Sequence, residues 1–325
     1  MVTHHVERRF FSRLIRLVFL TVSLATVIAL FSRAHWFAEL FSHFRFYFLL
    51  AQALLVLIFL HSGRWVLMAV TLMLAVPNAW YVVPYLTPLV MNQSVAAEQG
   101  KGIDIVAFNL NYRNEDHRAV REYLAAESPD VIVVAEVTEA WSDALSYLLD
   151  EYPYATGEWR SEPWGLMVYS RLPFVEAELL DLGVSGTVHA RVVLDVDDKL
   201  LQVFAVHLYS PTNPQRAARR NRQLDDLARQ VNASAVPTIV VGDLNVTPFS
   251  PYFANLLNGA GVVDARRPSG FHFTWPTSAA PLWIPIDHVL SDPSVIVTRV
   301  SRGPDTGSDH YPLEVSVVCC EAEPG

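Results

Sequence analysis

The residues with the clearest chemical potential are Asp243 and Asn245, which lie in the stretch Thr-Ile-Val-Val-Gly-Asp-Leu-Asn-Val-Thr-Pro. An apolar run of strand character breaks at Gly242 directly before them. Residues two apart in an extended chain share a face, so this carboxylate and this amide point the same way. A carboxylate can polarise a water or hold a cation, and an amide can donate to a phosphoryl oxygen. The alternative is an ordinary strand exit, where Gly, Asp and Asn occur for backbone reasons alone.

Further polar residues stand where other apolar runs end, and they bear on that choice. They are Asn109, Glu136, His207, Asp287, His288, Asp309 and His310. Each could be a structural cap by itself, but polar groups at the ends of several strands can converge on one edge of a sheet. Together they supply acids, amides and imidazoles without a convincing Ser or Cys nucleophile.

This set of side chains favours phosphate chemistry with a hard cation. Oxygen ligands without a thiol cluster suggest Mg²⁺ or Mn²⁺. The neutral amides and imidazoles suit an anionic substrate oxygen. The set therefore fits hydrolysis of a phosphate ester by an activated water, with metal and imidazole neutralising the developing charge.

Arg220 is a candidate phosphate ligand on independent grounds. It falls on the same helical stripe as Leu224, Leu227 and Val231, at spacings of four, seven and eleven. An arginine on the inward stripe, not far in sequence from His207, can bind phosphate. Pairing with an acid, or extension of its head towards water, is the alternative.

The elements that must position these residues alternate between strand and helix. We expect strands at 103–110, 131–135, 165–171, 188–196, 200–208, 238–242, 286–290 and 313–318. We expect helices at 115–127, after the capping residue Thr138, and after Asn213-Pro214. Helices that flank partly antiparallel sheets predict a layered α/β sandwich.

The N-terminal part has a different composition. Residues 1–98 hold seven Arg, no Lys and three acids, whereas the remainder holds 17 basic against 30 acidic residues, a net charge of −13. Segments 14–31, 46–60 and 65–83 are apolar and near the length of about 20 residues that crosses a bilayer. Segment 46–60 is short and could instead be re-entrant or interfacial. Three such segments are not explained by a cleaved signal peptide, and buried helices of a soluble protein are the alternative.

These features predict a transmembrane region and linker at 1–98 and a catalytic domain at 99–325. Breakers between Pro84 and Gly102 mark the linker. The positive-inside rule gives the orientation from the flanking basic residues. The N-terminal tail and the second short loop carry Arg8, Arg9, Arg13, Arg16 and Arg64. The first loop and the stretch after the third segment, on the other side of the membrane, carry only Arg33, Arg45 and Lys101. We therefore expect an inside N-terminus, a multi-pass protein and an extracytoplasmic catalytic domain.

The order of these residues also carries a resemblance. Asn109, Glu136, Gly165-Leu-Met-Val-Tyr-Ser-Arg171, His207, Gly242-Asp-Leu-Asn245, Ile286-Asp-His288 and Ser308-Asp-His310 resemble the endonuclease/exonuclease/phosphatase superfamily. The likeness covers 102–318, and the spans before Gly242-Asp-Leu-Asn-Val-Thr-Pro resemble its bacterial membrane-bound branch.

The resemblance implies a four-layer α/β/β/α sandwich and a role for each residue. Glu136 would ligate the metal with Asn109 and Asp309 beside it. Asp243 would position or deprotonate the water, and Asn245 would bind phosphate. His207 and His310 would act on the scissile phosphate, with Asp287 holding the His310 imidazole. The identity of the general base stays open.

We therefore expect a membrane-anchored, divalent-metal-dependent phosphoesterase whose partners are a phosphate-ester substrate and the lipid bilayer. A nuclease acting on DNA or RNA is the second enzyme hypothesis. Nucleic acid is not favoured, because the acidic domain has only Lys101 and Lys199 as lysines. A catalytically silent membrane scaffold is the alternative from another class.

Overall fold

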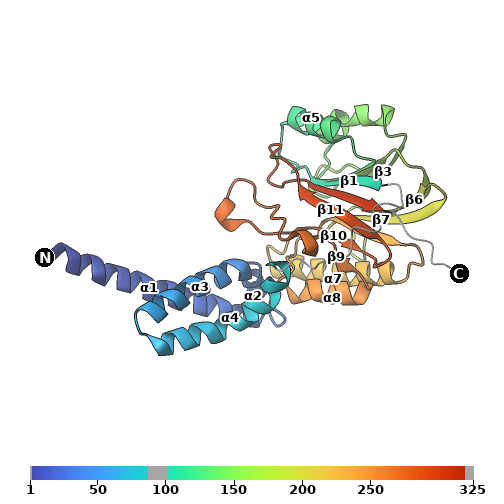
Figure 1. The fold of residues 1–325 in the computed structure, drawn as a ribbon. Coiled ribbons are helices and arrows are strands. Elements are labelled where there is room, and N and C mark those ends of the chain that lie inside the picture. Colours follow the sequence, from blue (N-terminus) through green and yellow to red (C-terminus); the bar gives the residue numbers. More distant parts are fainter. Residues whose placement is uncertain (1, 87–101, 319–325) are drawn as a thin grey trace. The chain divides into compact units, whose positions relative to one another are not determined.

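The computed structural model describes residues 2–86 and 102–318, with side chains described from residue 10 onward (Figure 1). Contacts divide the chain into two compact units. One unit holds the N-terminal helices together with Thr247–Pro251, and the other holds the rest of the described residues.

Two six-stranded mixed sheets form the larger unit. The first sheet has the order β11-β12-β1-β2-β4-β3, and the second has the order β5-β6-β7-β8-β10-β9. The strands of the first sheet are β1 (Gly102–Asn109), β2 (Val131–Ala135), β3 (Tyr154–Glu158), β4 (Leu166–Ser170), β11 (Ile296–Arg302) and β12 (Leu313–Val318). Those of the second are β5 (Phe174–Leu180), β6 (His189–Val196), β7 (Lys199–His207), β8 (Thr238–Asp243), β9 (Val263–Asp264) and β10 (Asp287–Ser291).

Apolar side chains from both sheets form a shared core between them. Alternate residues of β1, such as Ile103 and Ile105, pack with Val203 of β7 and Val241 of β8. The opposite face of the first sheet packs on α5 (His117–Glu127) and α6 (Glu139–Ala144), and that of the second on α7 (Pro214–Asn232) and α8 (Pro251–Ala260). Figure 1 shows α5 on one outer side and α7 and α8 on the other. The predicted four-layer α/β/β/α sandwich is thus confirmed.

Three helices of this unit begin at side-chain caps. Asp116, Thr138 and Asn213 each accept a hydrogen bond from a backbone N–H of the first helical turn. The caps satisfy donors that have no partner inside the helix. Asp116 accordingly starts α5 at His117 rather than at the predicted residue 115.

The N-terminal unit consists of α1 (Val2–Leu30), α2 (Trp36–Ser42), α3 (Arg45–His61) and α4 (Trp65–Leu86). Phe10–Leu30 and Trp65–Leu86 are long and apolar enough to cross a membrane. Helices α2 and α3 pass that test only together, with a bend of 58° between them. Leu20, Leu24, Val66 and Trp80 are among the exposed large side chains. The predicted segment 46–60 is therefore the second arm of a bent pair.

Polar side chains at the centre of this unit join three of its helices. Asn78 of α4 donates to Thr26 of α1 at 3.1 Å and to Gln52 of α3 at 3.0 Å. Arg45 donates from Nη1 to Asn78 Oδ1 at 3.1 Å and from Nη2 to the Ala29 carbonyl at 2.9 Å. Because these side chains hydrogen-bond to one another, they can be buried inside an apolar bundle.

Arg45 is not a loop residue, which changes the count of basic residues that flank the apolar segments. It was counted as a basic residue of the first loop, but it is 2 % exposed and lies in the first turn of α3. Its removal from the loop count leaves Arg33 there and increases the excess of positive charge on the N-terminal side.

The predicted linker differs at its start. Pro84 lies inside α4, which also contains Pro77 and ends at Leu86. A proline removes one backbone donor but does not end a helix whose neighbours satisfy the freed carbonyl. The rest of the expected linker, 87–101, lies outside the described residues, as does Lys101.

Candidate active site

Strand pairing explains why residues distant in sequence meet at one edge of the sheets. Parallel pairing of β7 with β8 places His207 opposite Asp243, and antiparallel pairing of β8 with β10 places Asp243 opposite Asp287. In the other sheet, Asn109 lies opposite Ala135, the residue before Glu136. The predicted convergence of strand-end polar residues is thus present in the structure.

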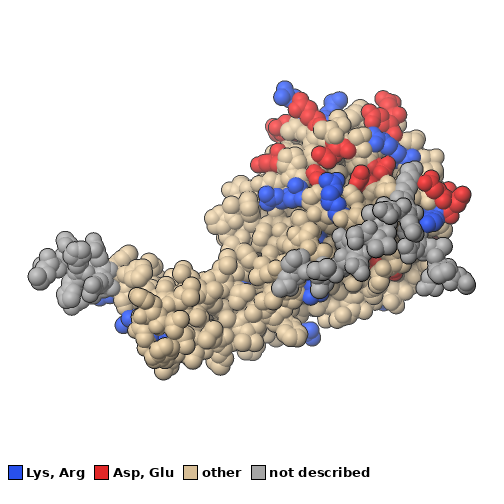
Figure 2. Space-filling view, in the orientation of Figure 1, with Lys and Arg blue, Asp and Glu red and all other residues tan. Residues whose placement is uncertain are grey.

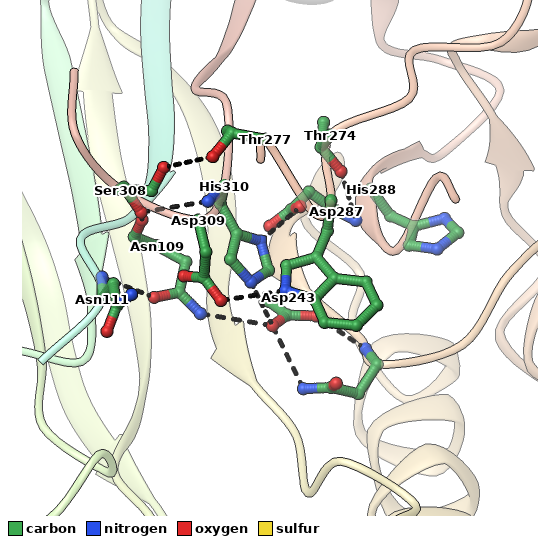
Figure 3. A network of polar contacts seen from close by, with 12 residues as sticks. Asn109, Asn111, Asp243, Thr274, Thr277, Asp287, His288, Ser308, Asp309 and His310 are labelled. Carbon is green, nitrogen blue, oxygen red and sulfur yellow. Dashed lines mark hydrogen bonds and ion pairs between the residues drawn. The ribbon is translucent and has the colours of Figure 1, made fainter. Parts of the chain in front are cut away.

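One carboxylate oxygen, Asp243 Oδ2, lies at the centre of this cluster (Figure 3). Asn109 Nδ2 donates to it at 3.3 Å and Asn245 Nδ2 at 3.1 Å. His207 Nε2 lies 3.7 Å and His310 Nε2 3.8 Å from the same oxygen. Four side-chain nitrogens from four chain segments therefore surround a single carboxyl oxygen.

Glu136 lies beside this centre and is more open to solvent. Its Oε1 accepts from Asn109 Nδ2 at 3.2 Å and lies 3.8 Å from His207 Nε2, while its Oε2 accepts from the Tyr112 N–H at 2.9 Å. The Glu136 side chain is 16 % exposed, against 2 % for Asp243. Of the two carboxylates, Glu136 is the one that a ligand from solvent reaches.

Asp287 and His310 form a buried pair. His310 Nδ1 lies 2.8 Å from Asp287 Oδ2, so the carboxylate fixes the ring while Nε2 faces Asp243. The segment before His310 is anchored as well, because Ser308 Oγ donates to the Asn109 carbonyl at 2.7 Å. Asp309 accepts from Trp275 Nε1 at 2.9 Å.

The backbone at the site takes conformations that most side chains avoid. Asn111, Glu136 and Asn245 have φ of 56°, 59° and 49°, in the left-handed region. Gly242 has φ of 129°, and a Cβ there would lie 2.1 Å from the Val206 carbonyl oxygen. Such strained residues persist only where surrounding contacts hold them, and they cluster at functional sites.

Burial and charge shift the pKa values of the cluster. Burial, reinforced by Asp287, raises the pKa of Asp243 well above its usual range. Burial alone would lower the pKa of His310, but Asp287 beside it raises that pKa to about 10. Burial would raise the pKa of Asp287, and the His310 cation outweighs it and holds that pKa below its usual range. Burial lowers the pKa of His207, which favours the neutral ring, and its Nε2 faces the carboxylates of Glu136 and Asp243.

The donor set fits the divalent cation that the sequence predicts. Asp243, Asp287 and His310 offer ligand atoms within 4.8 Å of one another, but a cation there would have to replace the Asp287–His310 hydrogen bond. Glu136 and Asp309 offer carboxylates that are only partly buried. The Asn109 Oδ1 accepts from the Asn111 N–H at 3.0 Å and keeps its second lone pair. Carboxylate and amide oxygens are the ligands of Mg²⁺ and Mn²⁺.

Arg220 lies inward, as its position on the helical stripe predicts, and is fully buried. It donates from Nη1 to the Asn245 carbonyl at 2.7 Å and from Nε to Asn221 Oδ1 at 2.8 Å. The guanidinium therefore supports the backbone that carries Asn245, and a direct contact of Arg220 with phosphate stays a prediction.

Two buried networks beneath the site were not anticipated. His189 Nδ1 accepts from the His207 N–H at 3.2 Å, and Gln223 Oε1 accepts from the Tyr209 N–H at 3.0 Å. Arg266 is bidentate to Asp264, at 3.0 and 2.8 Å.

The second network reaches two further site segments. Arg266 donates from Nη1 to the Asp287 carbonyl at 2.6 Å, and its Nη2 lies 2.7 Å from His288 Nδ1. His288 Nε2 in turn donates to the Val246 carbonyl at 2.6 Å. Asp264 ends β9 and Arg266 lies in the turn that follows it, so the two side chains meet through a turn rather than on one face of a strand.

Comparisons with known proteins agree with this fold. The model of the Endonuclease/Exonuclease/phosphatase family matches residues 106–310. TDP2 of D. rerio complexed with single strand DNA product is similar in fold, with TM-score 0.56, 19 % identity, and 67 % of this chain and 99 % of that chain covered. Sphingomyelinase C from Streptomyces griseocarneus gives TM-score 0.51, 21 % identity, and coverage of 66 % and 99 %. The endonuclease/exonuclease/phosphatase from Bacteroides vulgatus gives TM-score 0.57 and 16 % identity, with 67 % of this chain and 99 % of that chain covered. No curated protein matches the sequence.

Proposed function

The chain belongs to the endonuclease/exonuclease/phosphatase family, and we propose that it is a membrane-anchored, metal-dependent phosphoesterase that uses an activated water. One observation carries this proposal. Four side-chain nitrogens surround the carboxyl oxygen Asp243 Oδ2, in an arrangement that suits the oxygens of a phosphoryl group as well. Donors that are preorganised in this way stabilise charge that develops in a transition state.

The site residues would have three roles, which are metal binding, phosphate binding and activation of the water. Glu136, Asp309 and Asn109 would hold Mg²⁺ or Mn²⁺, which supplies charge neutralisation at a phosphoryl oxygen when bound. Asn245 and His207 would donate to the phosphoryl oxygens, with Asn245 Nδ2 exchanging its bond to Asp243 Oδ2 for one to the substrate. Asp243, which is held at Oδ1 by the Asn245 N–H at 2.8 Å, orients the attacking water and accepts its proton.

His310 completes this arrangement. Its Nε2 faces the reacting group while Asp287 keeps the ring in place. The cationic imidazole stabilises the negative charge that accumulates on the phosphoryl oxygens as the ester bond breaks.

The substrate class follows from charge and from the N-terminal helices. Acidic and basic residues are interspersed over the visible face of the catalytic unit (Figure 2), whereas duplex binders usually present several Lys and Arg to the phosphates. Two apolar helices that can cross a membrane bring the enzyme near lipid headgroups. We therefore favour a small or lipid-borne phosphate ester over duplex DNA and a multi-pass protein. In this proposal the bent pair α2–α3 crosses the membrane as the third span, which places the catalytic domain outside the cytoplasm.

Hydrolysis of bis(4-nitrophenyl) phosphate by the full chain in detergent micelles tests the proposal. Turnover should require Mg²⁺ or Mn²⁺, stop with chelator and resume when metal is restored. Asp243→Asn should remove it, whereas Asp225→Asn on the exposed side of α7 should not. A silent scaffold would give no turnover on this ester or on a panel of DNA, RNA, phospholipids and inositol phosphates. Plasmid nicking that dominates, with a steep salt dependence, would favour the nuclease hypothesis instead.

A further inference from the structure

An aromatic pair lies directly beside the candidate active site. The Trp164 ring is tilted against that of His207, with ring centroids 5.5 Å apart, and against that of Tyr209 at 4.4 Å. Both Trp164 and Tyr209 are buried, at 8 % and 5 % exposure. Because His207 Nε2 faces Asp243, this pair forms a wall one ring away from the phosphoryl site.

Two arginines of α7 lie over these rings. Arg216 Cζ is 5.4 Å from the centre of the Trp164 ring, and Arg219 Cζ is 5.3 Å from that of Tyr209. Arg219 Nη1 also donates to Tyr209 Oη at 3.2 Å, and Arg216 Nη1 to Thr212 Oγ1 at 3.4 Å. Stacking on an aromatic face holds a guanidinium in place while leaving most of its donors free.

Neither guanidinium is neutralised within the described part of the chain, in contrast to other arginines of the same unit. Arg160 and Arg171 each pair with a glutamate, and Arg191 pairs with two. Arg216 and Arg219 make only the neutral contacts given above, although Arg216 is half-buried. Positive charge that is fixed beside an active site and left without a carboxylate can bind an anionic group of a ligand.

We propose that Arg216 and Arg219 form a subsite for a second phosphate of the substrate, so that the preferred ester carries a further phosphoryl group near the scissile one. This inference rests on the proposed phosphoesterase function. The same arginines disfavour a cationic headgroup, because they occupy the aromatic faces that would otherwise hold a quaternary ammonium. The second phosphate can belong to a soluble molecule or to a lipid headgroup.

A pair of substrates that differ only in that phosphate gives the test. They are thymidine 5′-(4-nitrophenyl phosphate) and its 3′-phosphorylated form, with release of nitrophenol by the full chain in micelles as the readout. Wild type should show the lower KM for the 3′-phosphorylated ester. Arg216→Ala/Arg219→Ala should raise that KM by about ten- to a hundredfold, as expected for lost charge-assisted hydrogen bonds, and change the other KM less than about twofold.

Arg222→Ala is the matched control, because Arg222 is an exposed arginine of the same helix. It should leave both KM values unchanged. A lipid arm compares phosphatidylinositol 4-phosphate with phosphatidylinositol in mixed micelles and identifies the source of the second phosphate. Absence of a wild-type preference in both arms would overturn the subsite, and so would an equal effect of the double variant on both substrates of a pair.

Binding separates this inference from the proposed function. Thymidine 3′,5′-bisphosphate, titrated calorimetrically without metal, should bind wild type at least about tenfold more tightly than Arg216→Ala/Arg219→Ala. If the protein is inactive but shows this difference in affinity, the subsite is supported and the phosphoesterase function is refuted. If the protein is an active esterase but wild type and the double variant bind the bisphosphate equally well, the phosphoesterase function is supported and the subsite is refuted.

Discussion

Replacing Arg266 by leucine should destabilise the catalytic unit strongly. Arg266 and Asp264 are both about 1 % exposed as side chains, and their carboxylate–guanidinium contact is 2.8 Å. Removing one partner of such a buried pair costs about 3–5 kcal/mol, because the other charge is left without compensation. The Asp287 carbonyl and His288 Nδ1 lose a donor in the same variant, so we expect the upper end of that range.

Asp264→Leu combined with Arg266→Leu gives the second arm of the comparison. It removes both charges, so the double variant should be more stable than Arg266→Leu alone, with a coupling of about 0.5–3 kcal/mol. Arg160→Leu is the surface control, since its pair with Glu158 is 46 % exposed on each side and worth about 0–1 kcal/mol.

Pulse proteolysis of the full chain in detergent micelles across a urea series measures these differences. kcat should fall together with stability in Arg266→Leu, because the same guanidinium holds the backbone of the residue that orients His310. A loss for Arg266→Leu no larger than that for Arg160→Leu would refute the reasoning, as would a double variant less stable than Arg266→Leu.

Four further predictions concern metal, coupling between site residues, pH and topology. Glu136→Gln should raise the metal concentration for half-maximal activity at least about tenfold. The double variant Asp243→Asn/His310→Ala should lose little more activity than the worse of its two single variants, because the two residues act as one unit. Losses of activity that multiply would show that the two residues act independently. Burial lowers the pKa of His189 to about 3, so below about pH 6.5 the unfolded chain binds a proton at this residue that the folded chain does not bind. The free energy of unfolding should therefore fall by up to about 1.4 kcal/mol per pH unit on acidification. A urea midpoint that stays constant from pH 7 to pH 5 would contradict this. Reporter fusions at Gly100 and at the C-terminus should both read extracytoplasmic, and a cytoplasmic signal at both would reverse the orientation.

The layers and the convergence of polar residues follow from local patterns in the sequence. Apolar runs such as 131–135 and 238–242 identify buried strands, and a polar residue after each run is carried to a sheet edge whatever the pairing. The Asn213 cap and the stripe through Arg220 identify a helix and its inward face. These features depend on neighbours a few residues away, which a single sequence displays.

What the sequence does not display is pairing between distant segments. The Arg266–His288–Val246 network joins residues from three separate chain segments, and the register that brings Asp287 opposite Asp243 depends on the whole of β8 and β10. Burial of Arg45 depends in the same way on Asn78 of another helix, so a basic residue that resembles a loop flank lies inside the bundle. Arg220 was placed inward correctly, but its partner, the Asn245 carbonyl, is a backbone group that composition cannot indicate.

Hydrolysis in ¹⁸O-labelled water tests the central claim most directly. If Asp243 orients a water that attacks phosphorus, the phosphate product of a diester should carry one ¹⁸O and the alcohol product none, only when Mg²⁺ or Mn²⁺ is present. Asp243→Asn should abolish the labelled product, whereas Asp225→Asn should retain it. Label in the alcohol, or a labelled phosphate formed equally fast in chelator or by Asp243→Asn, would contradict the account.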